Sequence, residues 1–192
     1  MRTSQNQLLR FACVFFFFLA IHLSAVANVV VFRTYQDFEN KRGETYDDYL
    51  GGVVQMGKLT MELSKGVLKE NVKCSEIWGF TYNDKLFRVN RMGSPVLVIS
   101  QGKVCFYENG VAHMEAMRKG KAVATVSSGF VNFISHDLKS TILEMPMGMG
   151  QIKKEKEAFI AEQPETSSLF ECIGKFNDPD KTRECVKTFE GK

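Results

Sequence analysis

Once the apolar N-terminal segment is set aside, four cysteines and two histidines are the side chains best suited to covalent or metal chemistry. They are Cys74, Cys105, Cys172, Cys185, His113 and His136. Thiols serve as nucleophiles, metal ligands or disulfide partners, and imidazoles serve as bases or metal ligands. The spacing argues against a metal site, because the chain has neither a C-x-x-C nor an H-x-x-x-H pair.

An even number of cysteines in an exported chain indicates up to two disulfides. We expect Cys172 to pair with Cys185, because they lie on adjacent short predicted helices. A second pair, Cys74 with Cys105, would require two predicted strands to face each other. The alternative is that Cys74 and Cys105 are buried thiols in the role of small apolar residues. Both interpretations stay open.

One polar group contains the residue types of a hydrolase, since Ser135, His136 and Asp137 follow one another. Neighbours on a strand point to opposite faces, so adjacency does not assemble a triad. No G-x-S-x-G elbow and no phosphate loop occurs in the sequence. We therefore interpret His136 as a turn or helix-start residue.

A second polar group lies in the stretch 112–117, which we predict to be a strand. There His113 alternates with Glu115, so both would share one face, and a turn at residues 109–110 would bring Cys105 alongside. A Cys–His catalytic pair is the functional interpretation, and a buried thiol beside a surface histidine is the simpler one. We expect no catalytic residue, no metal and no cofactor.

Aromatic residues are the richer signal. Trp78, the only tryptophan, alternates with Phe80 and Tyr82, which predicts one shared strand face. Cross-strand aromatic pairs here would build the core. The functional alternative is an aromatic platform for a glycan or a peptide.

The elements that must position these residues read as α+β. From Cys74 to Glu108 apolar and aromatic runs alternate with turn signals such as Asn83-Asp84, which is typical of an antiparallel β-meander. Lys58–Leu63 alternates strictly, as a half-buried strand does. We expect six to nine strands, including 122–126 and 130–135, and then two or three short C-terminal helices. Residues 46–52 read as a loop and 66–72 as irregular.

The domain boundaries follow from changes in composition. Residues 1–27 have a basic start, an apolar run and an Ala25-Val26-Ala27 cleavage signal, which predicts a secretory signal peptide. We assign 28–143 to a β-rich domain, 144–152 to a flexible Met/Gly linker, and 153–192 to a helical tail. An uncleaved membrane anchor is the alternative for 1–27, although its apolar run is short for a bilayer.

Cleavage after Ala27 would leave 165 of the 192 residues, enough for one domain. The segment carries Arg2 and Arg10 and no acid, so the net charge would fall from +3 to +1. A nearly neutral chain does not attract nucleic acid, and membrane contact is expected only if the signal is retained. The expected location is the periplasm, the cell envelope or the exterior.

Several short aromatic motifs carry a resemblance to a known group. They are Tyr35-Gln36-Asp37-Phe38, Ile77-Trp78-Gly79-Phe80, Lys85–Val89, Gly102–Tyr107 and Ile134–Leu138. The chain resembles uncharacterised exported proteins of Bacteroidota, in which a "tYxdF" segment precedes a "WGF…yRi…Gki.lY" core. The resemblance covers about Val29 to Leu143 and implies an envelope or secreted β-rich domain. It implies no catalytic residues.

The sequence thus favours an exported, non-catalytic domain that binds a protein, a peptide or a glycan. One alternative is a thiol-dependent enzyme or redox protein that uses Cys74 or Cys105. The other is a membrane-tethered subunit of a complex.

Overall fold

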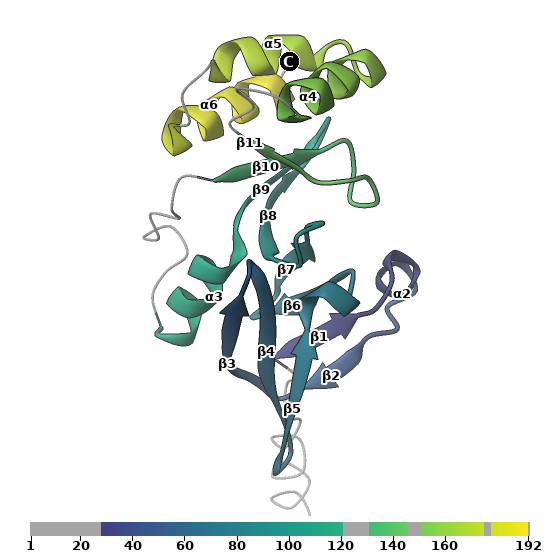
Figure 1. Ribbon diagram of the computed structural model, residues 1–192, viewed down its shortest axis with the longest axis vertical. Helices are drawn as coiled ribbons and strands as arrows, with labels where there is room; N and C mark the ends of the chain where they lie inside the picture. The colour runs from purple at the N-terminus through teal and green to yellow at the C-terminus, as the bar shows by residue number, and fades with distance from the viewer. Residues whose placement is uncertain (1–27, 121–130, 146–150, 175–177, 192) are drawn as a thin grey trace, which may run out of the picture.

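The computed structural model describes residues 28–120, 131–145, 151–174 and 178–191 (Figure 1). Within these ranges the chain forms an eight-stranded sheet, a three-stranded sheet and five α-helices, of which the last three follow the sheets. All strand pairs are antiparallel. The α+β class, the meander and the C-terminal helices are therefore confirmed.

The large sheet has the order β11-β10-β9-β8-β7-β6-β1-β2, so strands β6 to β11 follow one another as a meander. Its strands are β1 (Val29–Phe32), β2 (Glu44–Tyr46), β6 (Gly79–Tyr82), β7 (Lys85–Val89), β8 (Pro95–Gln101), β9 (Cys105–Asn109), β10 (Asn132–Ser135) and β11 (Leu143–Met145). The small sheet has the order β3-β4-β5, with β3 (Asp48–Gln55), β4 (Lys58–Lys65) and β5 (Leu68–Lys73).

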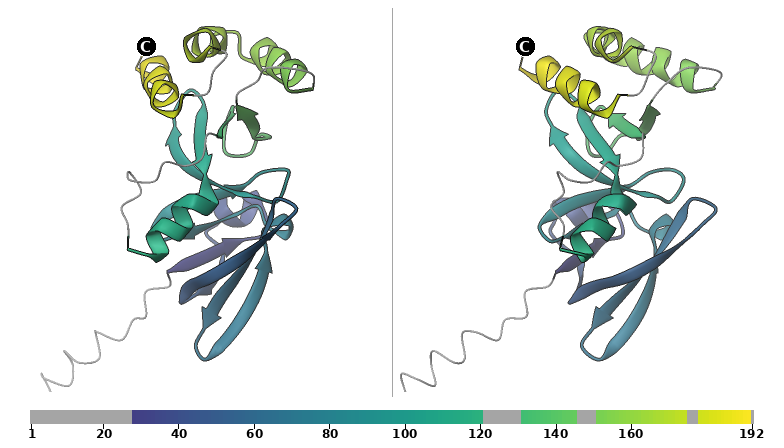
Figure 2. Two further views of the ribbon diagram at one scale, coloured as in Figure 1. Left: turned by 60° about the vertical axis from the view of Figure 1, so that its left-hand side comes forward. Right: turned by 90° about the vertical axis from the view of Figure 1, so that its left-hand side faces the viewer.

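The helices are α2 (Tyr35–Glu39), α3 (Gly110–Arg118), α4 (Gln151–Glu162), α5 (Thr166–Ile173) and α6 (Pro179–Glu190), and a 3₁₀ turn, η2, spans Cys74–Glu76. Figures 1 and 2 show α4, α5 and α6 as a layer over the end of the large sheet that holds β9, β10 and β11. The small sheet lies against the other end. None of the helices in the described ranges is long and apolar enough to cross a bilayer.

Two apolar clusters lie on one face of the large sheet. The lower cluster joins β1, β6, β7 and β8 to the small sheet and α3 through residues such as Phe80, Phe87 and Met61. The upper cluster joins β9, β10 and β11 to the C-terminal helices through residues such as Phe106 and Phe170. Alternation along β9 separates the two faces of the sheet, because Phe106 faces the helices while Tyr107 belongs to a third apolar cluster on the opposite face.

Local sequence rules explain several elements. The Asn83-Asp84 turn between β6 and β7 has φ of 48° and 60°, which these two residues tolerate and a two-residue hairpin loop requires. Thr34 caps α2 in a reciprocal capping box with Asp37. Asp178 caps α6, whose first turn holds Pro179.

The helix α3 replaces the strand that we predicted over 112–117, so that prediction is wrong. Asn109 accepts hydrogen bonds from the backbone N–H groups of Val111 and Ala112, and so it caps a helix instead of turning a hairpin. A Cβ atom on Gly110 would lie 2.5 Å from the carbonyl oxygen of Pro95, so only glycine fits here. The Asn109 cap and the close approach of Gly110 to Pro95 start the helix here, and good helix formers such as Ala112 and Glu115 continue it.

Two further stretches form strands where we predicted a loop and an irregular segment, so these predictions are wrong. The predicted loop 46–52 falls largely in β2 and β3, where Tyr46 and Tyr49 are buried, and the irregular stretch 66–72 forms most of β5. Of the two later strands, 130–135 corresponds to β10, and 122–126 lies outside the described residues. Met145, at the start of the predicted linker, is buried in β11, whereas 146–150 also lie outside.

The disulfide Cys172–Cys185 joins α5 to α6 across 13 residues, which is the pairing that the sequence favoured. We expect loss of this bond to lower the free energy of unfolding by about 2–4 kcal/mol, because a short loop would no longer be closed in the unfolded chain. Urea unfolding of the protein with and without reductant measures the change. In a Cys172→Ser/Cys185→Ser variant, reductant should not change the free energy of unfolding. A change in that variant would show that the effect of reductant does not come from this disulfide.

Candidate functional site

The face of the large sheet opposite the two clusters carries a half-buried aromatic group around Trp78. Tyr35 and Phe38 of α2 place their ring centroids 5.4 Å and 4.8 Å from that of Trp78. Phe38 also packs edge-on against Phe32 of β1 at 5.3 Å. The rings thus form a continuous surface that is partly open to solvent.

Backbone contacts fix the position of Trp78. Its N–H donates to the carbonyl groups of Phe32 and Arg33, and its carbonyl accepts from Val89. The next residue, Gly79, has no room for a side chain, since a Cβ atom would lie 2.4 Å from the carbonyl oxygen of Phe87. The W-G-F motif therefore combines a half-buried ring, a close strand approach and a core phenylalanine.

Trp78 does not share the face of Phe80 and Tyr82 as the alternation predicted. β6 begins only at Gly79, so the period of two does not extend back to Trp78. Phe80 stacks on Phe87 and Tyr82 contacts Tyr49, both inside the lower core cluster. The core interpretation fits Phe80 and Tyr82, and the platform interpretation fits Trp78 alone.

Arg88 of β7 lies beside this aromatic group and is the most unusual charge in the described structure. Its side chain is buried, with 6% of its surface exposed, and its guanidinium carbon is 5.1 Å from the centre of the Trp78 ring. Its Nη1 donates to the carbonyl oxygen of Ser140 at 3.0 Å and to the Tyr107 hydroxyl at 3.5 Å. No carboxylate of the described residues forms an ion pair with it.

A chain of hydroxyl groups continues from Arg88. The Ser135 hydroxyl donates to the carbonyl oxygen of Asp137 at 2.6 Å, so the Tyr107 hydroxyl, 2.6 Å from Ser135 Oγ, must donate to that oxygen. Burial raises the pKa of Tyr107 to about 12, which keeps its proton in place. Because both protons are committed, Ser135 is not poised as a nucleophile.

Asp137 is held by its own loop. Its Oδ1 accepts from the Ser140 hydroxyl and from the backbone N–H groups of Ser140 and Lys139, at 2.6–2.8 Å. These hydrogen bonds, with a smaller contribution from the charge of Arg88, lower the pKa of the Asp137 carboxyl. The loop thus presents its carboxylate toward its own backbone.

The structure separates His136 from Ser135 and Asp137. The His136 ring stacks on Phe159 of α4 at 3.7 Å, and its Nδ1 lies 2.8 Å from Gln163 Oε1. Its Nε2 is 3.0 Å from Glu162 Oε2 but lacks hydrogen-bond geometry toward it. His136 therefore connects the loop after β10 to α4, and Ser135, His136 and Asp137 do not form a catalytic triad.

His113 and Glu115, predicted to share a face, diverge on α3. His113 is fully buried, and its Nε2 lies 2.9 Å from Glu108 Oε2 of β9. Glu115 instead accepts from the Tyr49 hydroxyl and from Arg118. The surface interpretation of His113 is thus wrong, because an unexpected helix turned it inward.

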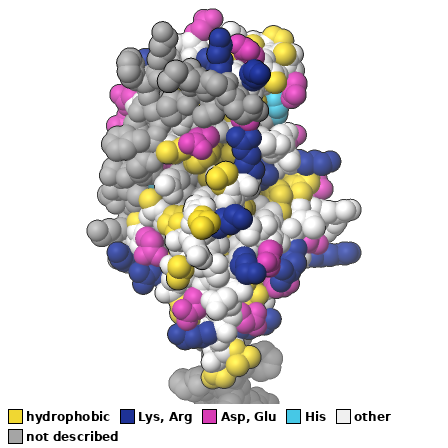
Figure 3. Space-filling model, viewed as in Figure 1, with side chains coloured by type: hydrophobic (Ala, Val, Ile, Leu, Met, Phe, Trp, Pro, Cys, Tyr) yellow, Lys and Arg dark blue, Asp and Glu magenta, His cyan; other side chains and the backbone are white. Residues whose placement is uncertain are grey.

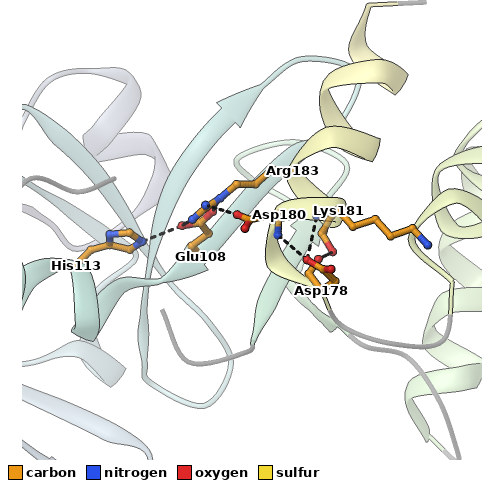
Figure 4. A network of polar contacts seen from close by, with 7 residues as sticks. Glu108, His113, Asp178, Asp180, Lys181 and Arg183 are labelled. Atoms are coloured by element: carbon orange, nitrogen blue, oxygen red, sulfur yellow. Dashed lines mark hydrogen bonds and ion pairs between the residues drawn. The ribbon is translucent and has the colours of Figure 1, made fainter. Parts of the chain in front are cut away.

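Glu108 binds two cationic or polar partners from distant parts of the chain (Figure 4). Arg183 of α6 donates to both of its carboxylate oxygens, at 2.5 Å and 2.8 Å, and His113 approaches from the other side. Burial alone would raise the pKa of Glu108, but these hydrogen bonds and the charge of Arg183 lower it to about 2. We interpret this network as structural, because it connects α3, β9 and α6, and Glu108 and His113 are buried at its centre.

The two remaining cysteines are free and buried, so the second disulfide is wrong. Cys74 of η2 belongs to the lower core cluster, while Cys105 of β9 faces the opposite side of the sheet with Tyr107. Burial raises the pKa of Cys74 to about 12 and also raises that of Cys105. A thiol held protonated and covered is a poor nucleophile.

A surface groove of about 290 Å³ lies between α4 and the loop 136–143. Its polar lining is mostly engaged within the groove, since Arg91 pairs with Glu155 at 2.6 Å and His136 contacts Gln163. On the face shown in Figure 3, basic and acidic side chains are interspersed with small hydrophobic patches. The described residues hold no group of three or more metal-binding side chains.

No protein-family model, curated protein or solved structure matches this chain. The assignment of a site therefore depends on geometry alone. Among the described features, the Trp78–Arg88 site combines half-buried rings with unsatisfied donors. The sequence pattern indicated Trp78 but not Arg88. The one sign of Arg88 in the sequence is a charge that lies between the apolar residues Phe87 and Val89.

Replacement of Glu108 by Gln should lower the free energy of unfolding by about 1–3 kcal/mol at pH 7, because the charge-assisted hydrogen bonds from Arg183 are weakened while Arg183 keeps its contact with Asp180. The pKa of Glu108 is lowered on folding, so its contribution is present above about pH 4.5 and is lost as the pH falls toward 2. Urea unfolding across this range should show a slope that Glu108→Gln reduces. Glu184→Gln, on the exposed side of α6, is the matched control and should keep the slope.

Alkylation of the native protein should modify neither Cys74 nor Cys105, because both thiols are covered and protonated. After unfolding without reductant, two alkyl groups should be added to protein that lacks residues 1–27, which carry Cys13, and intact mass counts them. Rapid modification of Cys105 in the native state would contradict this expectation. It would support the alternative of a thiol-dependent enzyme or redox protein.

Proposed function

We propose that this protein is an exported, non-catalytic domain that binds a glycan at the Trp78–Arg88 site. The observation that carries the proposal is the half-exposed ring surface of Tyr35, Phe38 and Trp78 beside a buried arginine. The C–H faces of sugar rings stack on indole and phenol rings, and adjacent polar groups then orient the hydroxyls. The Cys172–Cys185 disulfide and the predicted signal peptide support an oxidising destination.

A glycan is favoured over a peptide because of where the rings lie. Extended peptides commonly add a strand to a free sheet edge. The ring surface lies at the ends of β1, β6 and β7, which are interior strands of the large sheet, whereas β2 and β11 form its edges. A ligand at this site must therefore use faces and side chains instead of backbone pairing.

The single tryptophan reports directly on binding. Titration of the purified exported protein with a panel of neutral and acidic oligosaccharides should change the fluorescence of Trp78, because a stacked sugar replaces water at the indole. Trp78→Phe removes the signal, so its affinity is measured by calorimetry and should fall about tenfold or more, as loss of the larger ring suggests.

Phe189→Leu is the control, because Phe189 is an aromatic residue buried in the upper cluster away from the site. This change should leave affinity unaltered. Absence of binding by every saccharide in the panel would overturn the proposed function, and unchanged affinity in Trp78→Phe would move the site elsewhere.

A further inference from the structure

The hydrogen-bond donors of Arg88 are used on one side of the guanidinium only. Its Nη1 reaches Ser140 and Tyr107, whereas Nε and Nη2 donate to no described residue. Nε is fully covered and lacks a partner. The Nε–Nη2 edge is the one that binds a carboxylate through two parallel hydrogen bonds.

A second unsatisfied donor lies on the adjoining side chain. The indole Nε1 of Trp78 is also buried without an acceptor among the described residues, and the guanidinium carbon of Arg88 is 5.1 Å from this ring. Buried N–H groups without acceptors are rare in folded proteins, and each one calls for a water, an ion or a ligand. Here both groups are donors and one is charged, so the missing partner is an acceptor with negative charge.

The charge of Arg88 also indicates that the missing partner is an anion. A buried cation is costly unless an anion compensates it. The direct contacts of Arg88 are a carbonyl, a phenol and an aromatic face, and the charge of Asp137 interacts with it without forming an ion pair. The nearby Asp137 carboxylate is engaged by Lys139 and Ser140 and forms no ion pair with Arg88. The field at this site therefore favours an anion from outside the described chain.

We propose that the Nε–Nη2 edge of Arg88 and the indole N–H of Trp78 bind a ligand carboxylate, so that the site takes an acidic saccharide of the uronate type. This inference rests on the proposed function and specifies the chemistry of its ligand. The sugar ring stacks on Tyr35 and Trp78 while its carboxylate reaches Arg88. Because Nε of Arg88 and Nε1 of Trp78 are both covered in this structure, the carboxylate reaches them only when the half-buried rings of α2 move aside.

The test compares oligogalacturonate and glucuronate with their methyl esters, which keep the sugar and mask the charge. Binding to the exported protein is followed by calorimetry and by the single indole N–H resonance of Trp78. We expect the acids to bind about tenfold or more tighter than the esters, as a charge-assisted pair implies. The indole resonance should shift with the acids.

Two variants of matched size separate the carboxylate from the fold. Arg88→Lys keeps a positive charge but lacks the two-donor edge, and it should reduce the acid-over-ester preference to near one. Asp137→Asn keeps the acceptor oxygen that organises its loop but removes the nearby negative charge, so it should strengthen acid binding and leave ester binding unchanged. Thermal unfolding of each variant confirms that it is folded.

The outcomes distinguish this inference from the proposed function. Equal binding of acids and esters would overturn the carboxylate site and leave a glycan-binding domain. Acid preference that persists in folded Arg88→Lys would also overturn it. A glutamate-rich peptide that binds as tightly as oligogalacturonate would keep the carboxylate and reject the saccharide. Binding of none of these probes, with the oligosaccharide panel also negative, would overturn both proposals.

Discussion

The carboxylate of Glu108 is the interaction on which the two halves of the molecule depend. It lies on β9 at the boundary between the lower and upper apolar clusters, with 1% of its surface exposed. A lone buried carboxylate would be strongly unfavourable, so it requires the cation of Arg183 and the imidazole of His113 together. Because His113 lies on α3 and Arg183 on α6, their contacts with Glu108 fix the positions of both helices against the sheet.

The large sheet has two faces with different roles. One face is filled by the small sheet, α3 and the C-terminal helices, and its aromatic residues are packed to near-complete burial. The opposite face holds Arg88, Tyr107, Ser135 and the rings around Trp78, where polar groups and partial exposure persist. A rigid meander that is anchored on one face can hold such groups in fixed positions on the other.

Period and turn chemistry made most of the fold predictable. Leu59, Met61 and Leu63 alternate into the core, and Asn83-Asp84 and Asp178-Pro179 set a hairpin and a helix start. The errors arose where tertiary contacts override local pattern: Asn109-Gly110 has the letters of a hairpin turn but caps a helix against Pro95. The candidate site was predictable only through Trp78, because a buried cation without an anion can be seen only in three dimensions.

The ion pair between Glu108 and Arg183 spans 75 residues of sequence. While the chain is being made, β9 emerges with its carboxylate long before α6 can supply the guanidinium. Contacts of such separation form late and slow the search for the native state. Until Arg183 has been added, Glu108 can pair only with His113, which follows it by 5 residues.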